Sequence, residues 1–218
     1  GFDILAGIPR FIRLTCARTG ERAQMLPEIR RGVTYVLDRG YVALRLFRTI
    51  AEKRAYWVTR LKDGMTYEVL ERRTVTAEDR RRGILSDDVI RLGAEAPIRA
   101  RLVTFLAPNG RPFQFITNLY ELTPFEIAEL YRQRWSVETF FKFLKHAMTT
   151  RHLIARTLYG IHIQLLTAAI TYLLLVLFLA PERKPGDPPV TLSQMRRLAD
   201  RLIATIVTKA SPHFHESS

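Results

Sequence analysis

The hydrophobic positions in the first third of the chain alternate between strand spacing and helix spacing. Residues 32–37 form an apolar, β-branched run bounded by turn residues, and residues 55–61 form a second such run. Between them, Leu44, Phe47 and Ile50 follow the spacing of an amphipathic helix. A strand, a helix and a second strand in this order predict a βαβ unit in which the two strands pair in parallel.

Three shorter elements are predicted before this unit. Residues 2–5 and 8–16 have strand patterns and are joined at Ala6-Gly7, which is typical of a hairpin. Residues 21–29 have the pattern of a short helix that Pro27 interrupts.

The middle of the chain changes to a succession of strand-like runs. These runs are residues 67–76, 84–92, 98–106 and 112–117. Turn-forming DG, GAEAP and PNGRP sequences and an acidic, arginine-rich segment separate them, so residues 63–118 are predicted to form an antiparallel insertion. Its basic residues favour either contact with a polyanion or an ordinary solvated loop. They are Arg72, Arg73, Arg80, Arg81 and Arg82.

Residues 123–145, TPFEIAELYRQRWSVETFFKFLK, have the pattern of one long helix. Thr123 and Glu126 have the spacing of a capping box, and Pro124 occupies the first helical position, where its missing N–H is harmless. At about 100° per residue, one side of this helix carries a polar stripe within an arc of roughly 60°. The stripe consists of Tyr131, Arg134, Glu138 and Lys145.

A solvated helix face with ordinary charge pairs has the same pattern as this polar stripe. Trp135 and Phe141 border the stripe and are expected to belong to the core.

The last part of the chain begins with an apolar run at residues 161–180, which is long enough to cross a bilayer. Polar residues in its first half favour instead a core helix that packs on a sheet. Residues 181–189 are rich in proline and form a linker. Thr191 is expected to cap a final amphipathic helix at residues 192–207, and residues 211–218 are expected to fray.

The composition narrows the class of partner. The chain has 218 residues, of which 47% are hydrophobic and 25% charged, and this suits one globular domain with an elaborated insertion. Thirty-four Lys and Arg against 21 Asp and Glu give a net charge of +13, so a polyanion is the expected partner. Charge alone does not separate DNA from RNA or from an anionic membrane surface.

Cysteine content and the start of the chain favour a cytoplasmic protein. Cys16 is the single cysteine, which excludes an internal disulfide, and the histidines show no zinc-ligand spacing. Residues 1–12 lack the cationic and then apolar order of a signal peptide.

Asp38 is the candidate acidic residue of the βαβ unit. It directly follows the run at residues 32–37, at the carboxyl end of a predicted strand, which is where open α/β sheets place their ligands. An aspartate before Arg39-Gly40 is also ordinary turn chemistry, so the residues alone leave both interpretations open.

These patterns together resemble the DDE transposases of bacterial insertion sequences. Tyr131-x2-Arg134-x3-Glu138-x6-Lys145 matches without a gap the tyrosine, arginine, glutamate and lysine signature of the group with an all-β insertion before the last acid. Asp38-Arg39-Gly40-Tyr41 is similar to the segment that carries the family's second catalytic aspartate. The resemblance extends from residue 1 to about residue 178.

The resemblance implies an α/β fold, with a ribonuclease-H-like catalytic core, an antiparallel β insertion and C-terminal helices. It divides the chain into the following parts. Residues 1–62 are the first part of the core, without its first strand; residues 63–118 are the insertion; residues 119–180 are the signature helix and the core helix; residues 181–190 are a linker; and residues 191–218 are the C-terminal helix and tail.

The resemblance also implies a chemistry. Asp38 and Glu138 are expected to be catalytic and to bind Mg²⁺ or Mn²⁺, because two such ions activate the oxygen nucleophile and stabilise the leaving oxygen during phosphodiester cleavage. Tyr131, Arg134 and Lys145 are expected to contact phosphates of the transposon end.

The family's first aspartate lies upstream of the segment that matches residues 1–5. It is therefore expected to be absent from this chain, which predicts an N-terminally truncated transposase that is inactive by itself. Asp3 is the nearest acid, but it matches a position on the following strand.

The expected function is metal-dependent cleavage at transposon ends and strand transfer to target DNA. The alternatives are a non-catalytic DNA-binding remnant of a transposase, a metal-dependent nuclease that only cleaves and, least favoured, a membrane protein. The expected partners are double-stranded DNA and a second copy of the chain in a synaptic homodimer, without a membrane, in the cytoplasm and on the nucleoid.

Overall fold

The computed structural model describes residues 1–4, 8–10, 25–149, 157–179, 191, 193–195, 197, 198 and 201. The chain forms two compact units, which are described separately. One unit comprises residues 14–134, and the other comprises residues 1–13 together with residues 135–218.

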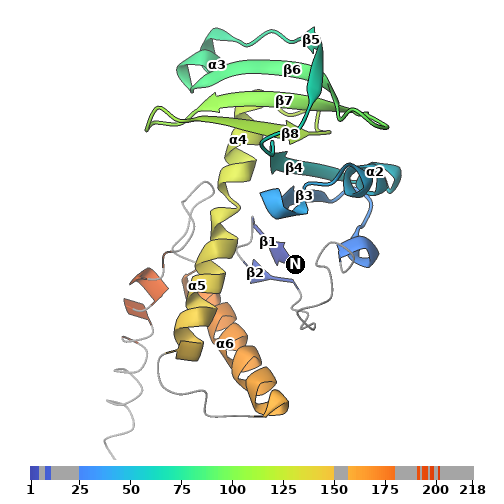
Figure 1. Cartoon of the computed structure of the whole chain (residues 1–218). Coiled ribbons are helices and arrows are strands. Elements are labelled where there is room, and N and C mark those ends of the chain that lie inside the picture. Colours follow the sequence, from blue (N-terminus) through green and yellow to red (C-terminus); the bar gives the residue numbers. More distant parts are fainter. Residues whose placement is uncertain are drawn as a thin grey trace, which may run out of the picture. The chain divides into compact units, whose positions relative to one another are not determined.

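The unit of residues 14–134 is built on a six-stranded sheet in the order β3-β4-β8-β7-β6-β5 (Figure 1). Its strands are β3 (Thr34–Leu37), β4 (Tyr56–Arg60), β5 (Tyr67–Arg72), β6 (Ile84–Leu92), β7 (Ile98–Leu106) and β8 (Pro112–Thr117). β3 and β4 are parallel, and every other neighbouring pair is antiparallel. The molecule is therefore of mixed α/β class with a mostly antiparallel sheet.

The predicted βαβ unit is confirmed. The helix α2 (Leu44–Glu52) connects β3 to β4 and buries Leu46, Phe47 and Ile50. The Phe47 ring stacks on Trp57 of β4, with 4.0 Å between ring centroids, so the helix lies on one face of the sheet. A short 3-10 helix, η1 (Leu26–Glu28), precedes β3 at the proline-containing segment.

The four strands of the middle segment are antiparallel, as predicted. Because β8 pairs with β4, they continue the sheet begun by β3 and β4. The short helix α3 (Ala77–Arg81) lies in the arginine-rich segment between β5 and β6. Gly83 follows it with a φ of +93°, and a Cβ atom there would lie 2.7 Å from the carbonyl oxygen of Leu106, so the tight entry into β6 requires glycine.

The second face of this sheet is covered by the helix α4 (Pro124–Arg132). Ile127, Ala128 and Tyr131 of α4 pack with Val58, Val103 and Phe115 from three strands. The predicted capping box is confirmed, since the Thr123 hydroxyl accepts from the Glu126 N–H at 3.2 Å and the Glu126 carboxylate accepts from the Thr123 N–H at 2.7 Å.

The prediction of one unbroken helix over residues 123–145 is wrong. α4 ends at Arg132, residues 133 and 134 form a turn, and α5 (Trp135–Thr149) begins at the next residue. The Arg134 N–H donates to the Tyr131 carbonyl instead of to residue 130, so the turn tightens here. The division between the two units also falls at this turn, and the signature residues are shared between the two units.

The other unit consists of α5, the helix α6 (Leu158–Leu179) and a two-stranded antiparallel hairpin of β1 (Phe2–Asp3) and β2 (Ile8–Pro9). Phe140 and Leu144 of α5 pack with Ala168, Tyr172 and Val176 of α6 in its core. The hairpin agrees with the predicted pairing, and Phe2 adds its ring to the same core at 5.5 Å from Phe140.

Only one side of α6 is buried in the described part of the chain. The opposite side exposes Tyr159, Ile163, Leu166, Ile170, Leu174, Leu177 and Phe178. By length and composition alone, residues 159–178 are apolar enough to cross a membrane, a test that core helices of soluble proteins also meet.

Several predicted features lie outside the described residues. They are Cys16, the linker at residues 181–189 and the end at residues 211–218. Of the last predicted helix, the described residues 193–195, 197, 198 and 201 are helical, and the Thr191 hydroxyl accepts from the Gln194 N–H at 3.3 Å as a cap.

Candidate functional site

Asp38 lies at the carboxyl end of β3 and caps a short 3-10 helix, η2 (Arg39–Tyr41). Its Oδ1 accepts from the Gly40 N–H at 3.1 Å, which fixes the side chain in an Asx-type turn. The carboxylate is nevertheless 54% exposed, so one side of it is open to water. Asp38 can therefore be both a turn residue and a site residue, because the turn holds its carboxylate in place and leaves it accessible.

Arg134 is the partner that the fold brings to Asp38. It lies in the turn directly after α4, and its Nη1 is 3.2 Å from Asp38 Oδ2. The Arg134 side chain is only 16% exposed, and its guanidinium lies 5.6 Å from the centroid of the Tyr131 ring. A signature residue and the predicted acid therefore meet within one unit, although they are far apart in sequence.

Tyr131 is a buried component of this cluster. Its ring is 7% exposed and lies 5.0 Å from Phe115, between centroids. Burial raises the pKa of Tyr131 above the ordinary value of 10.0, and the nearby charges of Arg134 and Arg60 oppose this rise. The phenol is therefore neutral at physiological pH and is a hydrogen-bond donor. A ring covered in this way has no face on which a displaced base can stack.

Arg60, at the end of β4, belongs to the same cluster and was not identified from the sequence. Its guanidinium lies 4.5 Å from the centroid of the Phe113 ring of β8. Among the described residues, no ion pair of Arg60 with an acid is present. The available signal was that Arg60 ends the strand parallel to β3, which places it at the same sheet edge as Asp38.

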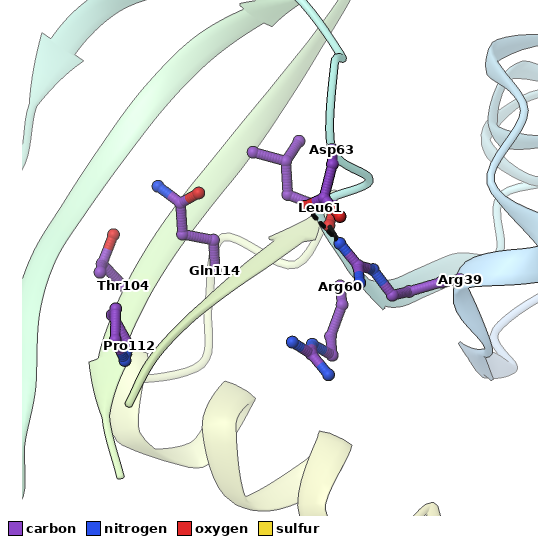
Figure 2. A pocket seen from close by; sticks show the side chains of 7 residues that line it. All are labelled: Arg39, Arg60, Leu61, Asp63, Thr104, Pro112 and Gln114. Carbon is purple, nitrogen blue, oxygen red and sulfur yellow. Dashed lines mark hydrogen bonds and ion pairs between the residues drawn. The ribbon is translucent and has the colours of Figure 1, made fainter. Parts of the chain in front are cut away.

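A pocket adjoins this edge, and both Arg39 and Arg60 are among the residues that line it (Figure 2). Arg39 lines it, donates to the Leu61 carbonyl at 3.1 Å and pairs with Asp63 at 2.6 Å. The side chain of Arg60 points away from Gln114, because successive side chains of a strand alternate and Arg60 lies over Phe113. The cation of Arg39 is therefore neutralised locally, whereas Arg60 faces the side of Tyr131.

Glu138 and Lys145 lie on α5 in the other unit. Glu138 is in the first turn and is partly buried, and Lys145 is exposed. The expectation that Trp135 and Phe141 belong to the core is wrong, since they are 55% and 53% exposed and Phe140 and Leu144 form the core instead. Trp135 and Phe141 therefore lie on the exposed side of α5, outside the core that Phe140 and Leu144 form.

The acids of the described residues do not form a group of three that could hold a metal ion. Asp38 and Glu138 each fit a divalent ion as a single hard oxygen ligand. Arg10 donates from Nε and Nη2 to one carboxylate oxygen of Asp3, Oδ2, at 3.1 Å and 2.6 Å, so this oxygen is already engaged within the hairpin.

The arginine-rich segment is locally paired. Arg81 and Arg82 both bind Glu78, and Arg73 lies 3.7 Å from Asp87. The two guanidiniums lower the pKa of Glu78. The solvated-loop interpretation accounts for this segment better than a dedicated DNA contact does.

Comparison with known proteins identifies the family of this chain. Residues 1–174 match the family model of the transposase DDE domain. A protein of Sinorhizobium fredii named as a transposase, y4zB, is 30% identical over 181 residues, which are 80% of this chain and 51% of that protein. The transposase named for insertion sequence element IS5377 of Geobacillus stearothermophilus is 31% identical over 146 residues, which are 64% of this chain and 38% of that protein.

A transposase named for the element IS4SA of Synechocystis is 28% identical over 193 residues, which are 84% of this chain and 53% of that protein. The chain thus spans about half the length or less of these relatives. Because the family model covers most of the chain and these relatives are named as transposases, two of them for insertion sequence elements, the chain belongs to the DDE transposases of insertion sequences.

Proposed function

We propose that this chain carries the catalytic centre of a transposase that cleaves DNA at transposon ends and transfers the freed 3′ end to target DNA. The family membership supports a DNA substrate and a transposase chemistry. The net charge of +13 agrees with a polyanionic substrate. The ribonuclease-H-like character of the core, interrupted by residues 63–118, is part of this proposal.

Asp38 and Glu138 are the proposed ligands of Mg²⁺ or Mn²⁺. Both are hard oxygen donors, and Asp38 keeps more than half of its side chain exposed while its turn holds it in place. When bound, the ions would supply an activated nucleophile and charge stabilisation at the leaving oxygen. The two acids come from different units, so each can be tested by itself.

Arg134 has two proposed roles that alternate. Without DNA it neutralises Asp38 at 3.2 Å. A phosphate of the DNA strand competes for the same guanidinium, which binds oxyanions through a planar fork. Release of Asp38 from this ion pair would leave both of its carboxylate oxygens more available to a cation. The ion pair therefore orients the acid before the substrate arrives.

Three other side chains are proposed to contact phosphates. Tyr131 donates from its neutral hydroxyl, and Lys145 is an exposed point charge on α5. Arg60 is the third proposed phosphate contact. It lies at the same sheet edge as Asp38, and its positive charge acts on the Tyr131 phenol. A synaptic homodimer acting on double-stranded DNA in the cytoplasm belongs to the same proposal.

The observation that carries the proposal is the contact between Asp38 and Arg134. It joins the second-acid segment to the signature segment within one folded unit. By itself this contact is a partly exposed ion pair. Only the family membership links it to phosphodiester chemistry.

The test uses the purified chain, a labelled duplex with the terminal DNA of its own element, and a plasmid target. With Mg²⁺ or Mn²⁺, strand cleavage and joined products that Asp38→Asn and Glu138→Gln both abolish would support this function and would contradict the inactivity expected of the isolated chain. Asp63→Asn is the matched control, because its side chain is 94% exposed and pairs only with Arg39 among the described residues. Cleavage that survives Asp38→Asn would contradict the assignment.

The two alternative functions give different products in the same assay. A nuclease that only cleaves gives nicked DNA without joined products. A non-catalytic remnant gives bound DNA and no cleavage in either metal.

A further inference from the structure

Arg101, in the middle of β7, is the most buried cation of the described chain. Its side chain is 1% exposed, and it binds Asp87 of β6 through two parallel hydrogen bonds of 2.7 Å and 2.8 Å. Asp87 is also buried, with 3% exposed. Such a pair is held at a considerable desolvation cost, and apolar residues of similar volume often stabilise a core as well. Stability alone therefore does not explain why two charged residues occupy this buried position.

The remaining donors of Arg101 hold the connector between β8 and α4. Its Nη1 donates to the Leu122 carbonyl at 2.6 Å and to the Leu119 carbonyl at 3.0 Å. Leu122 directly precedes Thr123, the N-cap of α4. A buried guanidinium thus ties the chain directly before α4 to the centre of the sheet.

Other hydrogen bonds immobilise the same connector. Arg73 donates to the Tyr120 carbonyl at 3.4 Å, and Arg73 also lies beside Asp87. The Leu119 N–H donates to the Thr117 hydroxyl at 3.0 Å, and that hydroxyl donates to the Trp57 carbonyl at 2.6 Å. Hydrogen bonds therefore tie the connector to β4, β7 and β8.

α4 carries this constraint to the candidate site. The connector leads directly into α4, which rises about 1.5 Å per residue. Tyr131 lies in the last turn of α4, and Arg134 lies just after it. Its buried side packs on the sheet, so a shift or tilt at its start moves the Arg134 guanidinium relative to Asp38. Displacements of about 1 Å are enough to weaken a catalytic arrangement strongly.

We infer that Arg101, oriented by Asp87, is a positioning residue of the transposase centre: it sets α4 so that Arg134 meets Asp38 and the DNA phosphate. The inference rests on the proposed function, since it explains how the fold holds Arg134 in place at that site. It requires no contact between Arg101 and DNA, which burial excludes.

The test is a thermodynamic cycle on the full chain with the labelled duplex and no added metal. Asp87→Leu combined with Arg101→Met removes both buried charges together and leaves no unpaired buried charge, so we expect a folded protein whose melting temperature is lowered by the loss of the hydrogen bonds to the two connector carbonyls. The two connector carbonyls lose their donor, and we expect DNA affinity to fall about fivefold to tenfold and the slope of log affinity against log salt to shrink by about one. Adding Arg134→Ala should change affinity by less than about twofold, since that contact is already lost.

The matched control removes an exposed pair from the same sheet, Glu68→Gln with Arg91→Gln, and should leave affinity and slope unchanged. If the buried double variant does not fold, Thr123→Ala replaces it, because this substitution loosens the same end of α4 from the exposed side. It should lower DNA affinity to a smaller degree, and this loss should also depend on Arg134. Additive effects with Arg134→Ala, or unchanged affinity in a folded double variant, overturn the inference. If Arg134→Ala has no effect in the wild-type background, the proposed function of Arg134 fails, and the inference fails with it.

Discussion

The two units of this protein hold their candidate residues in different ways. In the unit of residues 14–134, Asp38, Arg134 and Tyr131 come from separate elements and are fixed by hydrogen bonds, an ion pair and a sheet. In the other unit, Glu138 and Lys145 lie on one helix whose order comes from the apolar contacts of Phe140 and Leu144 with α6. A polar site in the first unit depends on precise tertiary contacts, whereas in the second it depends on the packing of a helix pair.

Core and polar substitutions should therefore have different effects in the two units. A core substitution in the helical unit should loosen α5 as a whole, while single polar substitutions in the sheet unit should alter the site and leave the fold intact. The following predictions test that contrast.

The largest effect is expected from Phe140→Ala. The side chain is 4% exposed and contacts Phe2, Phe141 and Tyr172, so its removal should destabilise the helical unit by about 3–5 kcal/mol. Thermal or urea unfolding monitored by far-UV circular dichroism measures this loss. Phe141→Ala is the control, because that ring is 53% exposed and should cost far less. Equal losses in the two variants would contradict the described core.

Arg134→Ala should weaken DNA binding about fivefold to tenfold and reduce the salt slope by about one. The reason is that one phosphate contact is lost while the sheet keeps its core. Binding titrations at several salt concentrations check both quantities. Arg132→Ala is the control, since Arg132 pairs with Glu129 on the exposed side of α4. A parallel shift of both variants would show that only net charge matters.

Asp38→Asn should abolish metal-dependent activity but strengthen DNA binding in the absence of metal, by about twofold to fivefold. The substitution removes the acid that pairs with Arg134 at 3.2 Å, so the guanidinium is released for phosphate. Affinity measured in EDTA tests this. Weaker binding of Asp38→Asn would show that the acid orients Arg134 and does not compete with DNA for it.

The smallest effect concerns the start of α4 and depends on pH. Hydrogen bonds from the Thr123 N–H and hydroxyl lower the pKa of Glu126 below its ordinary value of 4.5. A lowered folded-state pKa contributes stability that is present above pH 4.5 and is lost as the pH falls through the folded-state value. Glu126→Gln should remove this dependence, and Thr123→Ala should cost about 1 kcal/mol at neutral pH. Unfolding curves at pH 7 and at successive values below 4.5 measure both.

Much of the fold was predictable because local patterns decide it. The bounds of β6, β7 and β8 agree with the strand-like runs, and the parallel pairing of β3 with β4 follows from the intervening helix. The resemblance to DDE transposases is confirmed by the family match. The metal ligands and DNA contacts of the signature residues stay predictions.

The break at residues 133 and 134 was not predictable from helical spacing, because no proline or glycine marks it. Nor does periodicity distinguish a ring that packs on Phe115, as Tyr131 does, from one that faces a substrate. Arg60 and Arg101 both looked like ordinary strand residues, since their partners come from strands and loops remote in sequence.

The sequence by itself determined the order of strands and helices, the capping of α4, the excess of positive charge and the family, because spacing and residue type are properties of the chain alone. Tertiary structure decided that Asp38 pairs with Arg134, that Tyr131 is buried and that Arg101 ties α4 to the sheet. These are contacts between distant segments, and their geometry exists only when the sheet brings the segments together.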